Sequence, residues 1–141
     1  KLVNVIANSV VPKITMILGG SFGAGNYALC GKAFDPRFLF AWPTARYAVM
    51  GGEQAASTLL DIAVSALKRS GHAPDAAELT ELKKQVEASY QEQTDIRYGA
   101  ARLWVDAIVP PEQTRQALLT ALAAATRHDE GKVFKTGVLQ V

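Results

Sequence analysis

A glycine-rich loop between an apolar run and a helix-compatible segment is the part of this sequence best suited to chemistry. The apolar run at residues 14–18 stops at a loop that contains Gly19, Gly20, Gly23 and Gly25. Glycine adopts positive-φ turns readily and lets a ligand approach the main chain closely. A strand, a glycine turn and a helix start in this order can direct backbone N–H groups at developing negative charge.

One chemical interpretation of the loop is a dinucleotide site. Residues 23–28 match the G-x-G-x-x-A fingerprint, which also requires an acidic residue about 20 positions later, after the next strand. That region contains no carboxylate; it holds Trp42, Pro43, Thr44 and Arg46. The fingerprint alone is therefore weak evidence for nucleotide binding.

A second interpretation is a serine hydrolase. Residues 19–23 fit G-x-S-x-G, with Ser21 as the nucleophile, and Asp106 and His128 follow in the order typical of that fold. Aspartate and histidine are common, however, and His128 lies in a polar segment typical of a solvated helix end. We expect His72 and His128 to be surface histidines.

A third interpretation requires only the main chain. Ala24 and Gly25 would head a short helix, and their amides would stabilise an enolate or a ureido anion. We also expect a positive φ at Gly25, so that Gly25→Val would displace the loop. The sequence shows no converging acid and base, no metal-ligand cluster and no phosphate loop. Tight helix–strand packing explains the glycines equally well.

Length and composition limit the remaining possibilities. A chain of 141 residues with 49% hydrophobic and 20% charged residues predicts one globular domain. No apolar stretch approaches the ~20 residues of a membrane span, and a net charge of +2 argues against nucleic acid as the main partner. The single Cys30 suits a reducing compartment and a packing role. The start at Lys1, without a signal peptide, suggests a piece of a longer polypeptide.

Apolar periodicity and turn residues predict α/β class, because short strands alternate with helices. Asp75 and Glu78 form a capping box at the start of a polar helix. Alanine-rich helices leave apolar faces that we expect neighbouring subunits to cover. We expect a helix end before Pro12, strands at 14–18, 38–41, 47–50 and 105–109, and helices at 26–33, 53–70, 75–93, 97–104 and 112–127.

Several blocks in order resemble one known family. They are VPKITMILGGSFGAGNYALCG (11–31), FDPRFLFAWPTAR (34–46), VMGGEQAA (49–56) and YGAARLWVDAIVPPEQTRQAL (98–118). They are similar to the C-terminal part of the carboxyltransferase (β) subunit of biotin-dependent acyl-CoA carboxylases, in the methylcrotonoyl-CoA and geranoyl-CoA branch. The polar insert at 70–94 also resembles this branch.

The resemblance implies a crotonase-like (ClpP/crotonase) α/β superhelix of ββα units, with residues 1–141 forming the second carboxyltransferase domain. It implies transfer of a carboxyl group from carboxybiotin to the γ-carbon of a branched unsaturated acyl-CoA. The amides of Ala24 and Gly25 would form the oxyanion hole for biotin, with Phe22, Gly23 and Asn26 beside the cofactor. Biotin would be carried on a partner subunit, coenzyme A would enter as the substrate thioester, and no metal is expected.

The implied partners are the N-terminal half of the β subunit, further β subunits and the biotin-bearing α subunit. The implied location is the cytoplasm of a bacterium or the mitochondrial matrix of a eukaryote, and the piece alone would be inactive. Methylcrotonoyl enzymes usually read GSYGAGNYGMCGRAYSPRF, and departures such as Phe22 and Ala28 favour a longer, geranoyl-like acyl chain. A serine hydrolase and a non-catalytic assembly piece are the alternatives.

Overall fold

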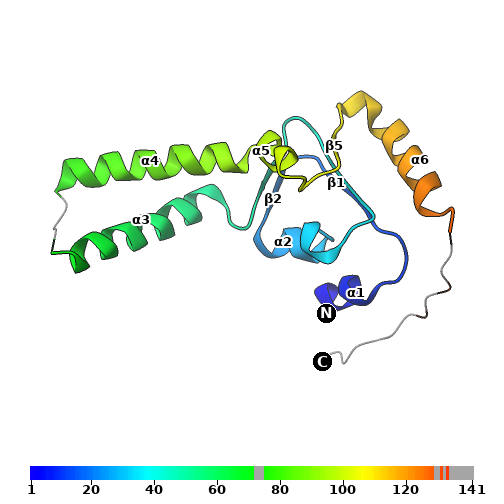
Figure 1. The fold of residues 1–141 in the computed structure, drawn as a ribbon, viewed down its shortest axis with the longest axis horizontal. Coiled ribbons are helices and arrows are strands. Elements are labelled where there is room, and N and C mark those ends of the chain that lie inside the picture. Colours follow the sequence, from blue (N-terminus) through cyan, green and yellow to red (C-terminus); the bar gives the residue numbers. More distant parts are fainter. Residues whose placement is uncertain (72–74, 129–130, 132, 134–141) are drawn as a thin grey trace.

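The computed structural model describes residues 1–71, 75–128, 131 and 133. Strands and helices alternate through a small body from which a helical hairpin projects (Figure 1). In chain order the elements are α1 (Leu2–Asn8), β1 (Ile14–Ile17), β2 (Gly20–Phe22), α2 (Gly23–Ala28), the 3₁₀ turn η1 (Lys32–Phe34), β3 (Phe38–Ala41), β4 (Arg46–Ala48), α3 (Gly52–Arg69), α4 (Ala76–Thr94), α5 (Ile96–Ala101), β5 (Ala107–Ile108), the 3₁₀ turn η2 (Pro111–Gln113) and α6 (Thr114–Ala125).

A three-stranded parallel sheet in the order β1-β3-β5 forms the centre of the body. Side chains alternate between its faces, as the two-residue period of a strand requires. Along β3, Leu39 and Ala41 belong to one apolar cluster, whereas Phe38 and Phe40 belong to the cluster on the other face. The apolar run of β3 is therefore buried from both sides.

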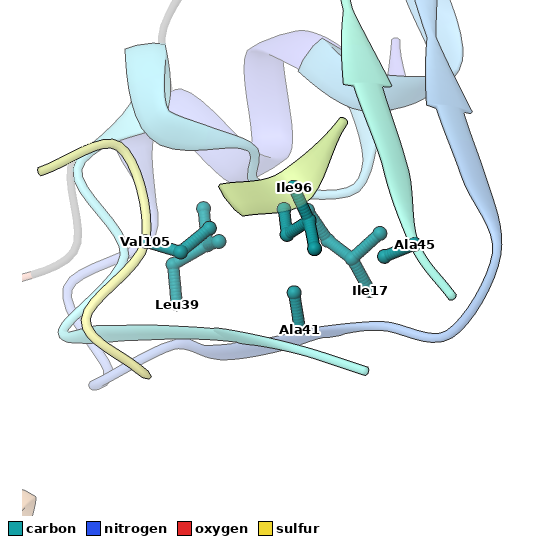
Figure 2. Packing of buried hydrophobic residues seen from close by; sticks show 6 residues of the cluster. All are labelled: Ile17, Leu39, Ala41, Ala45, Ile96 and Val105. Carbon is teal, nitrogen blue, oxygen red and sulfur yellow. The ribbon is translucent and has the colours of Figure 1, made fainter. Parts of the chain in front are cut away.

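The first cluster fills the space between the sheet and α5 (Figure 2). Leu39 and Ile96 are its largest fully buried side chains. Asp106 makes two hydrogen bonds to Leu39 of β3. Its backbone N–H donates to the Leu39 carbonyl at 2.8 Å, and its Oδ2 accepts from the Leu39 N–H at 2.7 Å. The cluster comprises Ile17, Leu39, Ala41, Ala45, Ile96 and Val105.

The second cluster joins the opposite face of the sheet to α6. Its buried members are Phe40, Val109 and Ala121, and the Phe38 and Phe40 rings stack with centroids 5.8 Å apart. The Trp42 indole N–H donates to Thr114 Oγ1 at 2.9 Å, which fixes the first turn of α6. Two small clusters rather than one large core thus hold the sheet.

A second, two-stranded parallel sheet pairs β2 with β4, with Gly20 opposite Arg46 and Phe22 opposite Ala48. The sequence did not predict β2. Its three residues carry no strand pattern of their own, so the strand exists because β4, more than 20 residues later, supplies the ladder partner.

Helices α3 and α4 form an antiparallel hairpin that extends away from the strands (Figure 1). The predicted capping box is confirmed, because Asp75 Oδ1 accepts from the Glu78 N–H at 2.8 Å and Glu78 Oε2 accepts from the Asp75 N–H at 3.1 Å. The Tyr90 hydroxyl donates to the Met50 carbonyl and ties α4 to the start of α3.

Several predicted boundaries were wrong by a few residues. The helix expected at 26–33 is α2, which begins at Gly23 and ends at Ala28 because Cys30 turns left-handed with φ 61°. The strand at 47–50 lies at Arg46–Ala48, and the strand at 105–109 shortens to Ala107–Ile108. The helix at 97–104 ends at Ala101, and the final helix begins with a 3₁₀ turn at Pro111.

Candidate active site

Two helices begin at the same edge of the β2–β4 sheet. β2 passes directly into α2 at Gly23, and β4 passes through residues 49–51 into α3. Because β2 and β4 are parallel and in register, both helix starts lie at their shared carboxyl edge. In open α/β folds, ligands bind in the crevice outside the carboxyl ends of the strands.

The first turn of α2 leaves its backbone donors open. Phe22 is the N-cap, with φ −132° and ψ 151°, and no side chain caps the helix. Gly23, Ala24 and Gly25 follow, and first-turn N–H groups have no acceptor within their own helix. Ala24 and Gly25 are exposed, and a Cβ at Gly25 would meet nothing within 4 Å. A ligand can therefore approach these amides closely.

Two other glycines of the loop, Gly20 and Gly23, have local structural reasons. A Cβ at Gly20 would lie 2.7 Å from the Phe22 ring, and a Cβ at Gly23 would lie 3.6 Å from the Val49 carbonyl oxygen. Gly23 has φ 56°, in the left-handed region. The positive φ expected at Gly25 was wrong, because the turn falls at Gly23 and leaves Gly25 inside the helix.

Asn26 is a buried residue that connects the loop to its surroundings by hydrogen bonds. It is only 7% exposed, and its Oδ1 accepts a hydrogen bond from Ser21 Oγ at 3.2 Å. Its carbonyl accepts from the Gly31 N–H at 2.7 Å, and a Cβ at Gly31 would overlap Oδ1. The buried amide thus joins β2, α2 and the segment after α2.

The residues of the predicted hydrolase triad have separate partners. Ser21 donates to Asn26, the Asp106 carboxylate accepts the Leu39 amide, and His128 is exposed beyond the end of α6. In the part of the chain that the structure describes, no hydrogen bond joins any two of the three. His72 lies outside the described residues.

Cys30 is buried at the end of α2. Burial raises the pKa of its thiol above the ordinary value, and the nearby Lys13 charge partly opposes this shift. Its Sγ donates to the Phe34 carbonyl at 3.6 Å, and its own carbonyl accepts from Thr15 Oγ1 at 2.8 Å. These contacts give Cys30 a packing role, as expected.

Among residues 1–71, 75–128, 131 and 133, no set of three His, Cys, Asp or Glu side chains gathers where it could bind a metal ion. Within the same residues, every helix is too short or too polar to cross a bilayer.

Comparison with known proteins defines the class of this chain. The model of the carboxyl transferase domain family matches residues 1–137, and the chain belongs to that family. Methylcrotonoyl-CoA carboxylase beta chain, mitochondrial, of Dictyostelium discoideum is 43% identical over 124 residues, which cover 88% of this chain and 21% of the relative. The biotin-dependent 3-methylcrotonyl-coenzyme A carboxylase beta1 subunit of Mycobacterium tuberculosis is 45% identical, over 87% of this chain and 23% of the relative.

Solved structures agree with the predicted fold. The geranyl-CoA carboxylase beta subunit of P. aeruginosa superposes with a TM-score of 0.75 at 37% identity, covering 99% of this chain and 26% of that chain. The transcarboxylase 12S hexamer gives a TM-score of 0.76 at 26% identity, over 98% of this chain and 25% of that chain. The crotonase-like α/β fold is confirmed, and the chain spans about a quarter of the length of the relatives it matches.

Proposed function

We propose that this chain is the carboxybiotin-receiving part of the carboxyltransferase (β) subunit of a biotin-dependent acyl-CoA carboxylase. The observation that carries the proposal is the open first turn of α2 at the carboxyl edge of β2 and β4, in a chain of the carboxyl transferase family. The donor set fits a neutral ureido group that would become anionic as the carboxyl group leaves, because amides supply hydrogen bonds without adding charge.

The chain's contribution to the reaction is positioning and electrostatic stabilisation. Carboxybiotin, when bound, supplies the carboxyl group. The amides of Ala24 and Gly25 would donate to the ureido oxygen and stabilise negative charge there, and donors that are already oriented would lower the barrier. Phe22 and Gly23 line the approach, and buried Asn26 keeps the turn rigid. No side chain of this segment forms or breaks a bond.

The substrate that we propose is a branched, α,β-unsaturated acyl-CoA that is carboxylated at its γ-carbon. The similarity to the methylcrotonoyl-CoA and geranyl-CoA carboxylase subunits supports this class. The acyl pocket lies largely in the part of the β subunit upstream of this chain. The departures at Phe22 and Ala28 favour the longer geranoyl group over methylcrotonoyl.

The proposed partners are the upstream half of the β subunit, other β subunits and an α subunit that carries biotin. Large exposed apolar side chains support assembly, including Leu29 at 68% and Leu103 at 80% exposure. Such surfaces are typical of protein interfaces.

The chain alone should aggregate or self-associate, and a sharp monomer peak in sedimentation would contradict this. The proposed location is the cytoplasm of a bacterium or the mitochondrial matrix of a eukaryote.

The test is a carboxylation assay of the β subunit that contains this chain, assembled with a biotin-bearing α subunit. Incorporation of labelled bicarbonate into geranoyl-CoA or methylcrotonoyl-CoA is expected, with kcat/KM deciding between the two. Ser21→Ala should retain carboxylation, because the hydroxyl only supports Asn26. Labelling of Ser21 by a serine-reactive probe, together with loss of activity in Ser21→Ala, would favour the hydrolase instead.

A further inference from the structure

One face of the projecting helix α3 has no neighbour in the described structure. Six side chains line a shallow hollow of about 300 Å³ along this face. They recur at helical spacing on the side of α3 that α4 does not cover, and Ile62 among them is 60% exposed. We call this set the α3 outer face; it comprises Thr58, Asp61, Ile62, Ser65, Ala66 and Arg69.

The outer face consists of two parallel rows with four-residue spacing. One row is Thr58, Ile62 and Ala66, and the other is Asp61, Ser65 and Arg69. Rows of this kind are the ridges that interdigitate when two helices pack. The small side chains near Ser65 allow close approach, and exposed Ile62 supplies apolar surface. The face therefore has the form of a helix-packing surface.

The charges of the outer face are complementary to those of a second, reversed copy. Asp61 and Arg69 stand four residues before and after Ser65, and neither forms an ion pair with another described residue. If two α3 helices pack antiparallel with Ser65 on the two-fold axis, each Asp61 faces the Arg69 of the other copy. Such a self-complementary patch is the requirement for a symmetric dimer contact.

We propose that the α3 outer face docks on the same face of a second copy of this chain, antiparallel and centred on Ser65. From Thr58 to Arg69 the face is about 16 Å long at ~1.5 Å per residue. Standard interfaces bury roughly 800 Å² per partner, more than one helix face of this length can supply. The contact is accordingly one of several that hold a larger assembly. An experiment must therefore detect this contact at the α3 outer face itself rather than through the oligomeric state.

A cysteine at the two-fold axis provides that local signal. Ser65→Cys should form an interchain disulfide under mild oxidation, because the two Cβ atoms approach across the axis. The matched control is Gln85→Cys on the exposed face of α4, which should cross-link at the background rate of the unaltered chain, whose Cys30 is buried. Equal cross-linking rates for Ser65→Cys and Gln85→Cys would overturn the proposal. This is also the result expected if a different partner covers α3.

Charge reversal in the Ser65→Cys background tests the orientation. Asp61→Arg or Arg69→Asp alone should slow cross-linking by about tenfold, because each creates two like-charge contacts per dimer. The double reversal should return the rate to within about threefold of the starting value. All these positions are exposed, so thermal unfolding should be unchanged, which separates a lost contact from a lost fold. Absence of rescue in the double variant would overturn the antiparallel pairing.

Discussion

Helices α2 and α5 have the same length and the same ending but opposite beginnings. Each has six residues, and each ends with three backbone hydrogen bonds from the residues after it back to its last turn. In both, the position that usually holds glycine is occupied by another residue in the left-handed region, Cys30 with φ 61° and Leu103 with φ 60°. Asp95 caps α5 with its carboxylate, whereas Phe22 offers α2 no side-chain acceptor.

Under our proposal, this difference distinguishes the helix start that binds a ligand from the one that does not. At α5, Asp95 Oδ1 accepts from the Arg97 N–H at 2.8 Å, and the Arg97 side chain adds an ion pair at 3.0 Å. At α2 no side chain caps the first turn, Ala24 and Gly25 are exposed, and a Cβ at Gly25 would meet nothing within 4 Å. A helix of this size gains stability from a cap; α2 lacks one, and on our proposal its first-turn donors are left for the cofactor.

The largest effect is expected from Gly25→Val. The added side chain occupies the open space through which the cofactor would approach, so carboxyl transfer in the assembled enzyme should fall by at least ~10²–10³, the typical effect of losing one oxyanion donor. Stability should not fall, since glycine inside a helix is itself unfavourable by roughly 0.5–1 kcal/mol. Near-normal turnover in a correctly assembled Gly25→Val enzyme would show that the glycine has only a packing role.

Gly31→Ala should reduce stability the most among the substitutions near α2. The added Cβ overlaps Asn26 Oδ1, so the buried amide must move, and overpacking of this kind typically costs about 1–3 kcal/mol. Urea denaturation measures the loss. Gly19→Ala is the matched control, because its Cβ would meet nothing within 4 Å. Equal stability of the two variants would contradict the role given to Asn26.

Asp95→Ala should cost about 1 kcal/mol through loss of the α5 cap, and Asp95→Asn should cost less because asparagine caps equally well. Hydrogen bonds from Arg97 lower the pKa of Asp95 below its ordinary value of 3.8. The charged Asp95 carboxylate therefore stabilises the folded state. This contribution is complete above about pH 4 and is lost as pH falls through the lower, folded-state pKa of Asp95. Thermal melts of Asp95→Asn should lack this acid-side loss; an unchanged pH profile would refute the assignment.

The smallest effect concerns the left-handed residues that end the two helices. Leu103→Gly should stabilise the chain by a few tenths to about 1 kcal/mol, because strain is relieved and the leucine buries little surface. Cys30→Gly should give no gain, since the buried thiol would be lost. Denaturation midpoints that rank the two variants in the reverse order would show that Leu103 packs on the fold.

The sequence predicted the elements whose signals are local. The apolar runs of β1 and β3, the periodicity of α3 and the box between Asp75 and Glu78 are all readable within one turn or strand, and all are present. The order of strand, glycine turn and helix also located the loop around Ala24 and Gly25.

The features that the sequence did not predict depend on distant partners. β2 requires β4 as its ladder partner, and the role of Asp106 as an acceptor for the Leu39 amide appears only when 67 residues of chain are folded back. The left-handed turn falls at Gly23, where β2 passes into α2, whereas Gly25 lies inside the helix. Neighbouring glycines look alike in the sequence, and only the folded backbone distinguishes the turn at Gly23 from the helical position at Gly25.

The most direct test of the central claim is a structure of the assembled carboxylase with biotin bound. We predict that the ureido oxygen lies about 2.7–3.2 Å from the backbone nitrogens of Ala24 and Gly25, the range of an N–H···O hydrogen bond. The capped start of α5 should have no such ligand. A ureido oxygen bound elsewhere, with both amides occupied by acceptors within the protein, would contradict the account.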